Sequence, residues 1–132
     1  MKKRAFGWIG VAAAVAAIAA WAQLGAPRGV QTSGFKVVAA YPHDPAAFTQ
    51  GLAIADGRLY EGTGQYGASS LRRVDLTTGR VEKIRPLNPR YFGEGIAVLN
   101  GRIYQLTWQN ELGIVYDADT FEVLRTFSYD GE

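Results

Sequence analysis

The chain has 132 residues, of which 14 are Lys or Arg, 12 are Asp or Glu and none is Cys. This length leaves room for one modest domain, and the lack of cysteine excludes disulfides, thiol nucleophiles and zinc sites built on Cys. Three basic residues occupy positions 2–4, and the remaining 11 are balanced by the 12 acidic ones. The sequence therefore has no basic patch typical of nucleic-acid binding, and we expect no nucleic-acid partner.

The N-terminus has the pattern of an export signal. Basic residues at positions 2–4 precede an apolar, Ala-rich run over 5–22, which ends in the small-x-small motif Ala-Trp-Ala. We predict a helical signal peptide over 1–22, cleaved after Ala22, and a polar linker over 23–34. The alternative is an uncleaved membrane anchor formed by residues 5–22, since 18 residues are near the lower limit for spanning a bilayer. In both cases we expect an exported protein, periplasmic or secreted, that meets the membrane only if this segment is retained.

A stretch of sequence occurs twice, 44 positions apart. The first copy, residues 48–64, reads FTQGLAIADGRLYEGTG, and the second, residues 92–108, reads FGEGIAVLNGRIYQLTW. Aligned by this shift, Phe48 corresponds to Phe92 and Gln50 corresponds to Glu94. A repeat of about 40–45 residues with several short strands in each unit is typical of a β-propeller.

Each repeat unit contains four strand-like runs separated by turn residues. The predicted strands are 51–55, 58–62, 70–76 and 80–85 in the first unit, and 95–99, 102–108, 113–117 and 122–129 in the second. Asp56-Gly57 and Asn100-Gly101 separate the first two runs of each unit, and such pairs are the strongest signals for two-residue hairpins. No window outside the leader has a sustained helical period. We predict an all-β fold in which each unit is one four-stranded propeller blade.

One further strand is predicted over residues 35–41, before the first repeat. Propellers often close their ring by pairing an N-terminal strand with the last blade, and we interpret this segment as that closing strand. Two blades cannot form a ring, since propellers have about four to eight blades. We therefore expect residues 35–132 to be a partial β-propeller, and the chain to be a truncated product or a fragment of a longer protein.

The best candidates for a functional site immediately precede the two innermost predicted strands. Equivalent positions of successive blades converge around a propeller axis, so we expect Gln50 and Glu94 to face one central pocket. Phe48 and Phe92 would flank it, and a carboxylate beside aromatic rings is partly desolvated, which raises its pKa and suits it to proton transfer. The alternative is that both Phe side chains fill the core and Glu94 caps a turn. The residues alone leave both interpretations open.

Other residues are weaker candidates. Trp108 ends the strand predicted over 102–108, and either lines a pocket or fills the space between blades. His43-Asp44 resembles part of a charge relay, but a lone His in a Pro-rich turn is more often structural. Arg72-Arg73 is most typical of a solvent-facing strand. Three turn acids fit Asx turns better than calcium sites: Asp75, Asp117 and Asp119.

Five ordered segments of the chain resemble the plant- and bacterial-type glutaminyl cyclases, the glutamine cyclotransferase family. The segments are HDPAAFTQGL (43–52), YGASSLRRVDLTTGRV (66–81), FGEGIAV (92–98), IYQLTW (103–108) and VYDADTFEVLRTFSY (115–129). The resemblance runs from about Phe35 to the last residue. It implies a five-bladed β-propeller, of which this chain would supply about two blades and the closing strand.

The resemblance also implies an activity, the conversion of an N-terminal glutamine of a peptide or protein to pyroglutamate with loss of ammonia. By motif match, Glu94 takes the place of the family's catalytic glutamate, and Gln50 that of a residue that hydrogen-bonds the substrate. Phe48 and Phe92 match aromatic pocket walls. Trp108 matches a tryptophan near the site. The resemblance implies no metal and no other cofactor, and a single His without Cys is a poor basis for a zinc site.

Two other interpretations stay open at this point. One is a non-catalytic exported propeller that binds peptides or other proteins. The other is an inert gene remnant, which would be favoured if the region downstream of residue 132 encoded the rest of the propeller out of frame.

Overall fold

The computed structural model describes residues 32–131. The chain divides after Val37 into two units, and the eight strands found among the described residues all belong to the second unit, Val38–Glu132. The signal peptide predicted over 1–22 and most of the linker predicted over 23–34 lie outside the described residues. Within residues 32–131 there is no helix of the length and apolar character that crossing a membrane requires.

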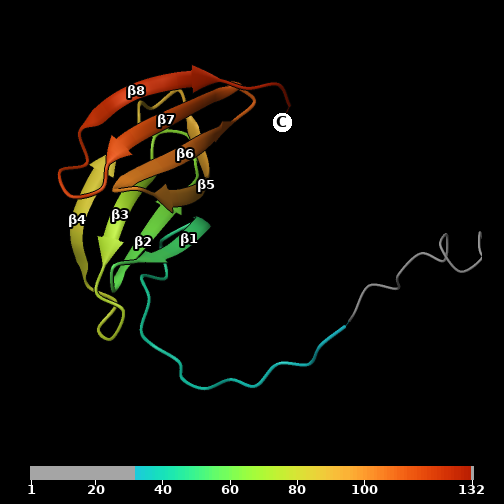
Figure 1. Ribbon diagram of the computed structural model, residues 1–132, viewed down its shortest axis with the longest axis vertical. Helices are drawn as coiled ribbons and strands as arrows, with labels where there is room; N and C mark the ends of the chain where they lie inside the picture. The colour runs from blue at the N-terminus through green and yellow to red at the C-terminus, as the bar shows by residue number, and fades with distance from the viewer. Residues whose placement is uncertain (1–31, 132) are drawn as a thin grey trace, which may run out of the picture. The chain divides into compact units, whose positions relative to one another are not determined.

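The eight strands form two separate four-stranded antiparallel sheets, each in simple sequence order (Figure 1). The first sheet consists of β1 (Thr49–Ala55), β2 (Arg58–Thr63), β3 (Ser70–Val74) and β4 (Val81–Pro86). The second consists of β5 (Phe92–Leu99), β6 (Arg102–Trp108), β7 (Leu112–Asp117) and β8 (Val123–Ser128). The predicted all-β fold and its division into two four-stranded units are thus confirmed, with strand ends shifted by up to three residues.

The first hairpin of each sheet is formed by the two-residue turn that the sequence predicts. Asp56 and Gly57 have φ values of 50° and 71°, and Asn100 and Gly101 have values of 50° and 69°. A type I′ turn requires positive φ at both central residues, which Asn, Asp and Gly tolerate best. These turns fix the register of β1 on β2 and of β5 on β6.

The strand predicted over residues 35–41 is absent from the structure. These residues form no ladder with any described strand, and Phe35 and Val38 are almost fully exposed. An extended segment becomes a stable strand only when its backbone groups pair with a neighbour. The largely apolar composition of this segment is therefore insufficient to predict a strand.

The two sheets pack against each other through β1 and β2 on one side and β5 on the other. Their shared core contains side chains from both sheets: Tyr60, Leu71, Leu87, Ile103, Ile114, Tyr116, Ala118 and Phe121. Leu71 and Ile103 are fully buried, and burying a side chain of this size contributes about 1.5–3 kcal/mol. At Gly51 an added Cβ would lie 2.6 Å from the backbone nitrogen of Ile96, so the close approach of β1 and β5 requires glycine there.

Two of the three predicted Asx turns are confirmed. The carboxylate of Asp75 accepts hydrogen bonds from Thr77 and Thr78, and that of Asp117 accepts from the turn that follows it. The side-chain hydroxyl of Thr77, followed by that of Thr78, lowers the pKa of Asp75 to about 2. Asp119 is different, because its carboxylate pairs with Arg58 of the first sheet instead.

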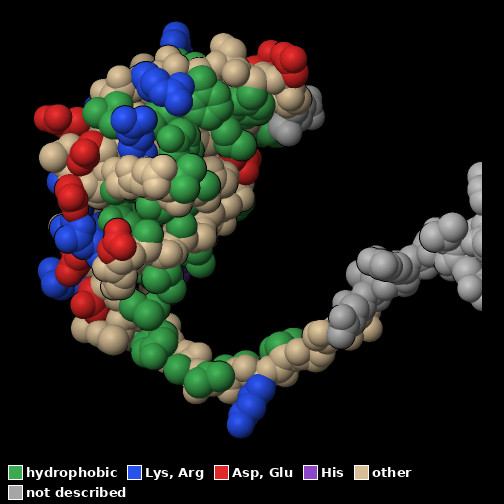
Figure 2. Space-filling model, in the orientation of Figure 1, with side chains coloured by type: hydrophobic (Ala, Val, Ile, Leu, Met, Phe, Trp, Pro, Cys, Tyr) green, Lys and Arg blue, Asp and Glu red, His purple; other side chains and the backbone are tan. Residues whose placement is uncertain are grey.

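Acidic and basic side chains are interspersed on the face of the molecule shown in Figure 2. They gather along the left edge, over the turn between β7 and β8 and over β4, and neither sign forms a continuous patch there. One contact at this edge connects the two sheets, since Lys83 Nζ donates a hydrogen bond to the backbone carbonyl of Asp119 at 2.7 Å. Hydrophobic side chains lie exposed over the second sheet on the same face.

Candidate active site

Gln50 lies at an irregularity in the pairing of β1 with β2. Thr49 pairs with Thr63, but Gly51 pairs with Gly62, so Gln50 is an extra residue without a partner on β2. Such a β-bulge bends the strand locally and re-aims the side chain of the extra residue. The sequence predicts that Gln50 precedes the strand, whereas it is in fact the second residue of β1.

The same irregularity recurs in the second sheet, at Glu94. Gly93 pairs with Thr107, and the next pair is Ile96 with Gln105, so the segment at Glu94 has one residue more than the facing part of β6. The sequence predicts that Glu94 also precedes its strand, but β5 begins at Phe92. Both candidate polar residues therefore occupy bulges at the beginning of the first strand of their sheets.

The two bulges bring the side chains of Gln50 and Glu94 together. Gln50 Nε2 donates a hydrogen bond to Glu94 Oε1 at 3.3 Å. Both side chains are half-buried, so the carboxylate is close to an amide donor and still open to solvent on one side. The sequence predicts that these two residues face one central pocket; the structure brings their side chains into contact, and of the two only Glu94 lines a hollow.

An aromatic cluster centred on Phe92 lies beside this pair. The ring of Phe92 meets Phe48, Tyr66 and Trp108 edge to face, with centroid distances of 5.9, 5.5 and 5.5 Å. Phe92 is only 9% exposed, whereas Phe48 is 49% and Trp108 is 39% exposed. Phe92 therefore fills space between the sheets, while Phe48 and Trp108 present ring surface to solvent. Tyr66, which comes from the loop between β2 and β3, is not among the residues that the sequence predicts.

A hollow of about 410 Å³ opens beside Glu94 in the second sheet. Its lining residues are Glu94, Gly95, Leu106, Thr107, Trp108 and Tyr129. Tyr129 is held in place because its hydroxyl donates a hydrogen bond to the backbone carbonyl of Thr107 at 2.7 Å. Of the predicted site residues, Glu94 and Trp108 line this hollow, and the other three, Phe48, Gln50 and Phe92, do not.

Four wall residues of this hollow are not among the site residues that the sequence predicts: Gly95, Leu106, Thr107 and Tyr129. Leu106 could have been found, since it lies two residues before Trp108 on β6 and alternate residues of a strand share a face. Tyr129 follows the end of β8, and no local pattern connects it with residues of β5 and β6.

The charged residues near the N-terminal end of β1 form a separate network. Arg72 Nη1 lies 2.9 Å from Asp44 Oδ2, and the pKa of Asp44 is lowered, first by the backbone N–H of Ala46 and then by Arg72. The Arg72 side chain is 12% exposed, so the prediction of a solvent-facing residue is wrong for it. No group of three or more His, Asp or Glu side chains within residues 32–131 could hold a metal ion.

Comparisons with known proteins assign this chain to a family. The family model described as glutamine cyclotransferase matches residues 9–132. The chain is 45% identical over 95 residues to the glutaminyl-peptide cyclotransferase of Arabidopsis thaliana, an alignment that covers 71% of this chain and 30% of that protein. The crystal structure of Myxococcus xanthus glutaminyl cyclase matches with a TM-score of 0.62 and 35% identity, covering 70% of this chain and 38% of that one.

The chain thus spans between 30% and 38% of the length of these two relatives. The family match covers nearly the whole sequence, including both sheets, the two bulges and the aromatic cluster. This chain belongs to the glutamine cyclotransferase family.

Proposed function

We propose that this chain contributes the catalytic carboxylate and part of the pocket of a glutaminyl-peptide cyclotransferase. The reaction cyclises the N-terminal glutamine of a peptide or protein to pyroglutamate and releases ammonia. One observation carries the proposal: Glu94 lies at a bulge, 3.3 Å from Gln50 Nε2, and lines a hollow that Trp108 borders. The matched relatives bear the names glutaminyl-peptide cyclotransferase and glutaminyl cyclase.

The chemistry requires one group that moves a proton. The neutral α-amine of the substrate attacks the carbon of its own side-chain carboxamide, and a new C–N bond closes a five-membered ring. The carboxylate of Glu94 accepts a proton from the attacking nitrogen and then gives it to the departing amide nitrogen, which leaves as ammonia when its C–N bond breaks. A carboxylate that serves first as base and then as acid typically contributes about 10²–10⁴-fold. The reaction balances with these proton transfers alone.

The other residues of the site have a positioning role in this proposal. The substrate side chain must fold back onto its own amine, and holding it in that geometry removes much of the entropic barrier. Gln50 carries an amide that can donate to or accept from the substrate carboxamide. The exposed ring surfaces of Phe48 and Trp108 supply apolar walls, against which the methylene groups of a glutamine side chain can pack.

The proposal extends to the architecture and location of the protein. The two sheets would be neighbouring blades of a five-bladed β-propeller, with β1 and β5 nearest the axis. The close packing of these strands at Gly51, where any Cβ would lie 2.6 Å from the backbone nitrogen of Ile96, supports this arrangement. The leader pattern over 1–22 supports export to the periplasm or the medium.

A paired-peptide assay tests the activity. The 132-residue chain is incubated with a Gln-initiated peptide, or with the same peptide beginning with Asn, and released ammonia is measured. Asn is one methylene shorter, so the same attack would have to form a strained four-membered ring. Ammonia from the Gln peptide and none from the Asn peptide supports the proposal. Binding of the Gln peptide without release of ammonia would refute it and favour a non-catalytic peptide-binding module.

A further inference from the structure

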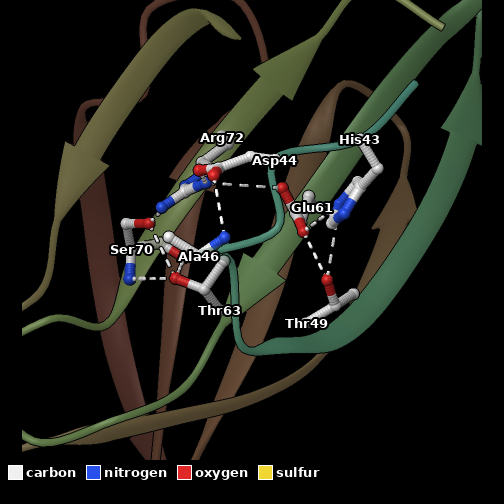
Figure 3. A network of polar contacts seen from close by, with 8 residues as sticks. All are labelled: His43, Asp44, Ala46, Thr49, Glu61, Thr63, Ser70 and Arg72. Atoms are coloured by element: carbon white, nitrogen blue, oxygen red, sulfur yellow. Dashed lines mark hydrogen bonds and ion pairs between the residues drawn. The ribbon is translucent and has the colours of Figure 1, made fainter. Parts of the chain in front are cut away.

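A buried carboxylate on β2 takes no part in the site described above. Glu61 is 1% exposed and does not line the hollow beside Glu94. Its Oε1 accepts a hydrogen bond from Thr49 Oγ1 at 2.6 Å and lies 2.9 Å from His43 Nε2. Its Oε2 lies 3.9 Å from Arg72 Nη1. Figure 3 shows these side chains converging on Glu61 from β1, β3 and the segment that precedes β1.

The second sheet shows that this position does not require a charge. The repeat shift of 44 residues makes Gln105 the equivalent of Glu61, and the residues of the third strands that pair with them, Arg72 and Ile114, are 42 residues apart. In the second sheet the Tyr116 hydroxyl donates to Gln105 Oε1 at 3.1 Å, and both side chains are almost completely buried. The fold therefore accommodates a neutral side chain, Gln105, at the position equivalent to Glu61. Burial of a carboxylate is costly unless it is paired and hydrogen-bonded, so the charged version in the first sheet calls for another explanation.

We propose that Glu61 is a positioning residue for Gln50 and acts through Thr49. Thr49 immediately precedes the bulged residue Gln50, and a bulge, unlike a regular strand, re-aims the side chain of its extra residue. The short bond from the Thr49 hydroxyl to Glu61 holds the Thr49 side chain on one face of the first sheet. With Thr49 held there, the Gln50 side chain extends from the bulge to its contact with Glu94.

Two further contacts keep this arrangement in one geometry. The backbone carbonyl of Phe48 accepts a hydrogen bond from the N–H of Gly64 at 2.8 Å, which fixes the residue before Thr49. His43 shares the same Glu61 oxygen as Thr49 and so restrains the carboxylate from the outer side. A residue at a bulge lacks a full set of ladder bonds, and side-chain contacts of this kind can replace them. The inference rests on the proposed function only for its effect on turnover.

Three variants of the full 132-residue chain separate positioning from general stabilisation. Thr49→Val removes the hydroxyl at nearly constant shape, and Thr49→Ser keeps it. Thr63→Val is the matched control, because Thr63 is buried on β2 and its hydroxyl bonds Ser70 rather than Glu61. The readouts are the NMR signal of the Gln50 side-chain amide, identified by its absence in Gln50→Ala, and the kcat and KM for a Gln-initiated peptide.

We expect Thr49→Val to move the Gln50 amide signal and to lower kcat/KM by about tenfold or more, since a misplacement of about 1 Å can cost about a hundredfold. Thr49→Ser should restore both, and Thr63→Val should lower the unfolding temperature while the Gln50 signal stays in place. An unmoved Gln50 signal in a folded Thr49→Val variant would overturn the inference. If the wild-type chain releases no ammonia, the proposed function fails, and the Gln50 signal alone still decides whether Glu61 positions this side chain.

Discussion

Gln50 and Glu94 occupy equivalent positions of two neighbouring sheets, 44 residues apart, and their side chains meet at 3.3 Å. The contact arises because both residues lie at a β-bulge near the beginning of the first strand of their sheet. A repeat that places the same bulge in each sheet aims one side chain from every unit at a common region. The two copies then differ in chemistry, since one supplies an amide and the other a carboxylate.

Gln50→Glu tests whether this contact matters for proton transfer. A second carboxylate beside Glu94 makes it harder to ionise the pair, because like charges at this distance disfavour each other. We expect the acidic limb of the pH profile of kcat/KM to move upward by about one unit or more. Gln50→Met is the control, since it removes the amide donor without adding charge, and should lower the rate and move the limb less than Gln50→Glu does. A profile of Gln50→Glu that coincides with that of Gln50→Met would contradict this account.

The packing of the two sheets predicts that two equivalent glycines respond differently to substitution. At Gly51 an added Cβ would lie 2.6 Å from the backbone nitrogen of Ile96, whereas at Gly95 it would meet nothing within 4 Å. We expect Gly51→Ala to destabilise the chain by about 1–3 kcal/mol, as overpacking usually does. Gly95→Ala should change the unfolding free energy by less than about 0.5 kcal/mol. Urea unfolding of both variants measures this difference, and equal effects would contradict the packing of β1 on β5.

Local patterns in the sequence predict most of the sheets. Asp56-Gly57 and Asn100-Gly101 adopt the positive φ values that their turns require, and all eight strands of the two repeats are present. The strand over 35–41 could not be judged locally, because a strand depends on a partner. The bulges at Gln50 and Glu94 are also properties of two strands together, so they appear only in the pairing register.

The candidate site is only partly predictable for a similar reason. The repeat alignment is enough to pair Gln50 with Glu94 and Phe48 with Phe92. It also matches Glu61 with Gln105, but the burial of Glu61 depends on tertiary contacts with His43 and Thr49. The sequence predicts that Arg72 faces solvent, because nothing in a strand sequence shows that the side chain of Asp44 pairs with it.

The Asx turn at Asp75 predicts a loss of stability in acid. Hydrogen bonds from Thr77 and Thr78 lower the pKa of this carboxyl to about 2 in the folded chain, compared with about 3.9 in an unfolded one. Its stabilising contribution is therefore present above about pH 4 and is lost as the pH falls toward 2.

Asp75→Asn keeps an acceptor oxygen but cannot titrate. We expect this variant to have a lower melting temperature than the wild type at pH 6, and the two melting temperatures to converge near pH 2. Thermal unfolding at several pH values measures this difference. Asp56→Asn serves as the control, since Asp56 is an exposed acid whose side chain makes no hydrogen bond within the described residues. If the melting temperatures of the wild type and Asp75→Asn differed by the same amount at every pH, this would contradict the assigned role of the turn.

The rate of ammonia release by Glu94→Gln tests the central claim most directly. The substitution keeps the size of the side chain and its contact with Gln50, and removes the group that is proposed to move the proton. For a Gln-initiated peptide we predict a fall in kcat of at least about hundredfold, with the circular dichroism spectrum and unfolding midpoint unchanged. Turnover at the wild-type rate in this variant would show that Glu94 does not transfer the proton, and would contradict the account.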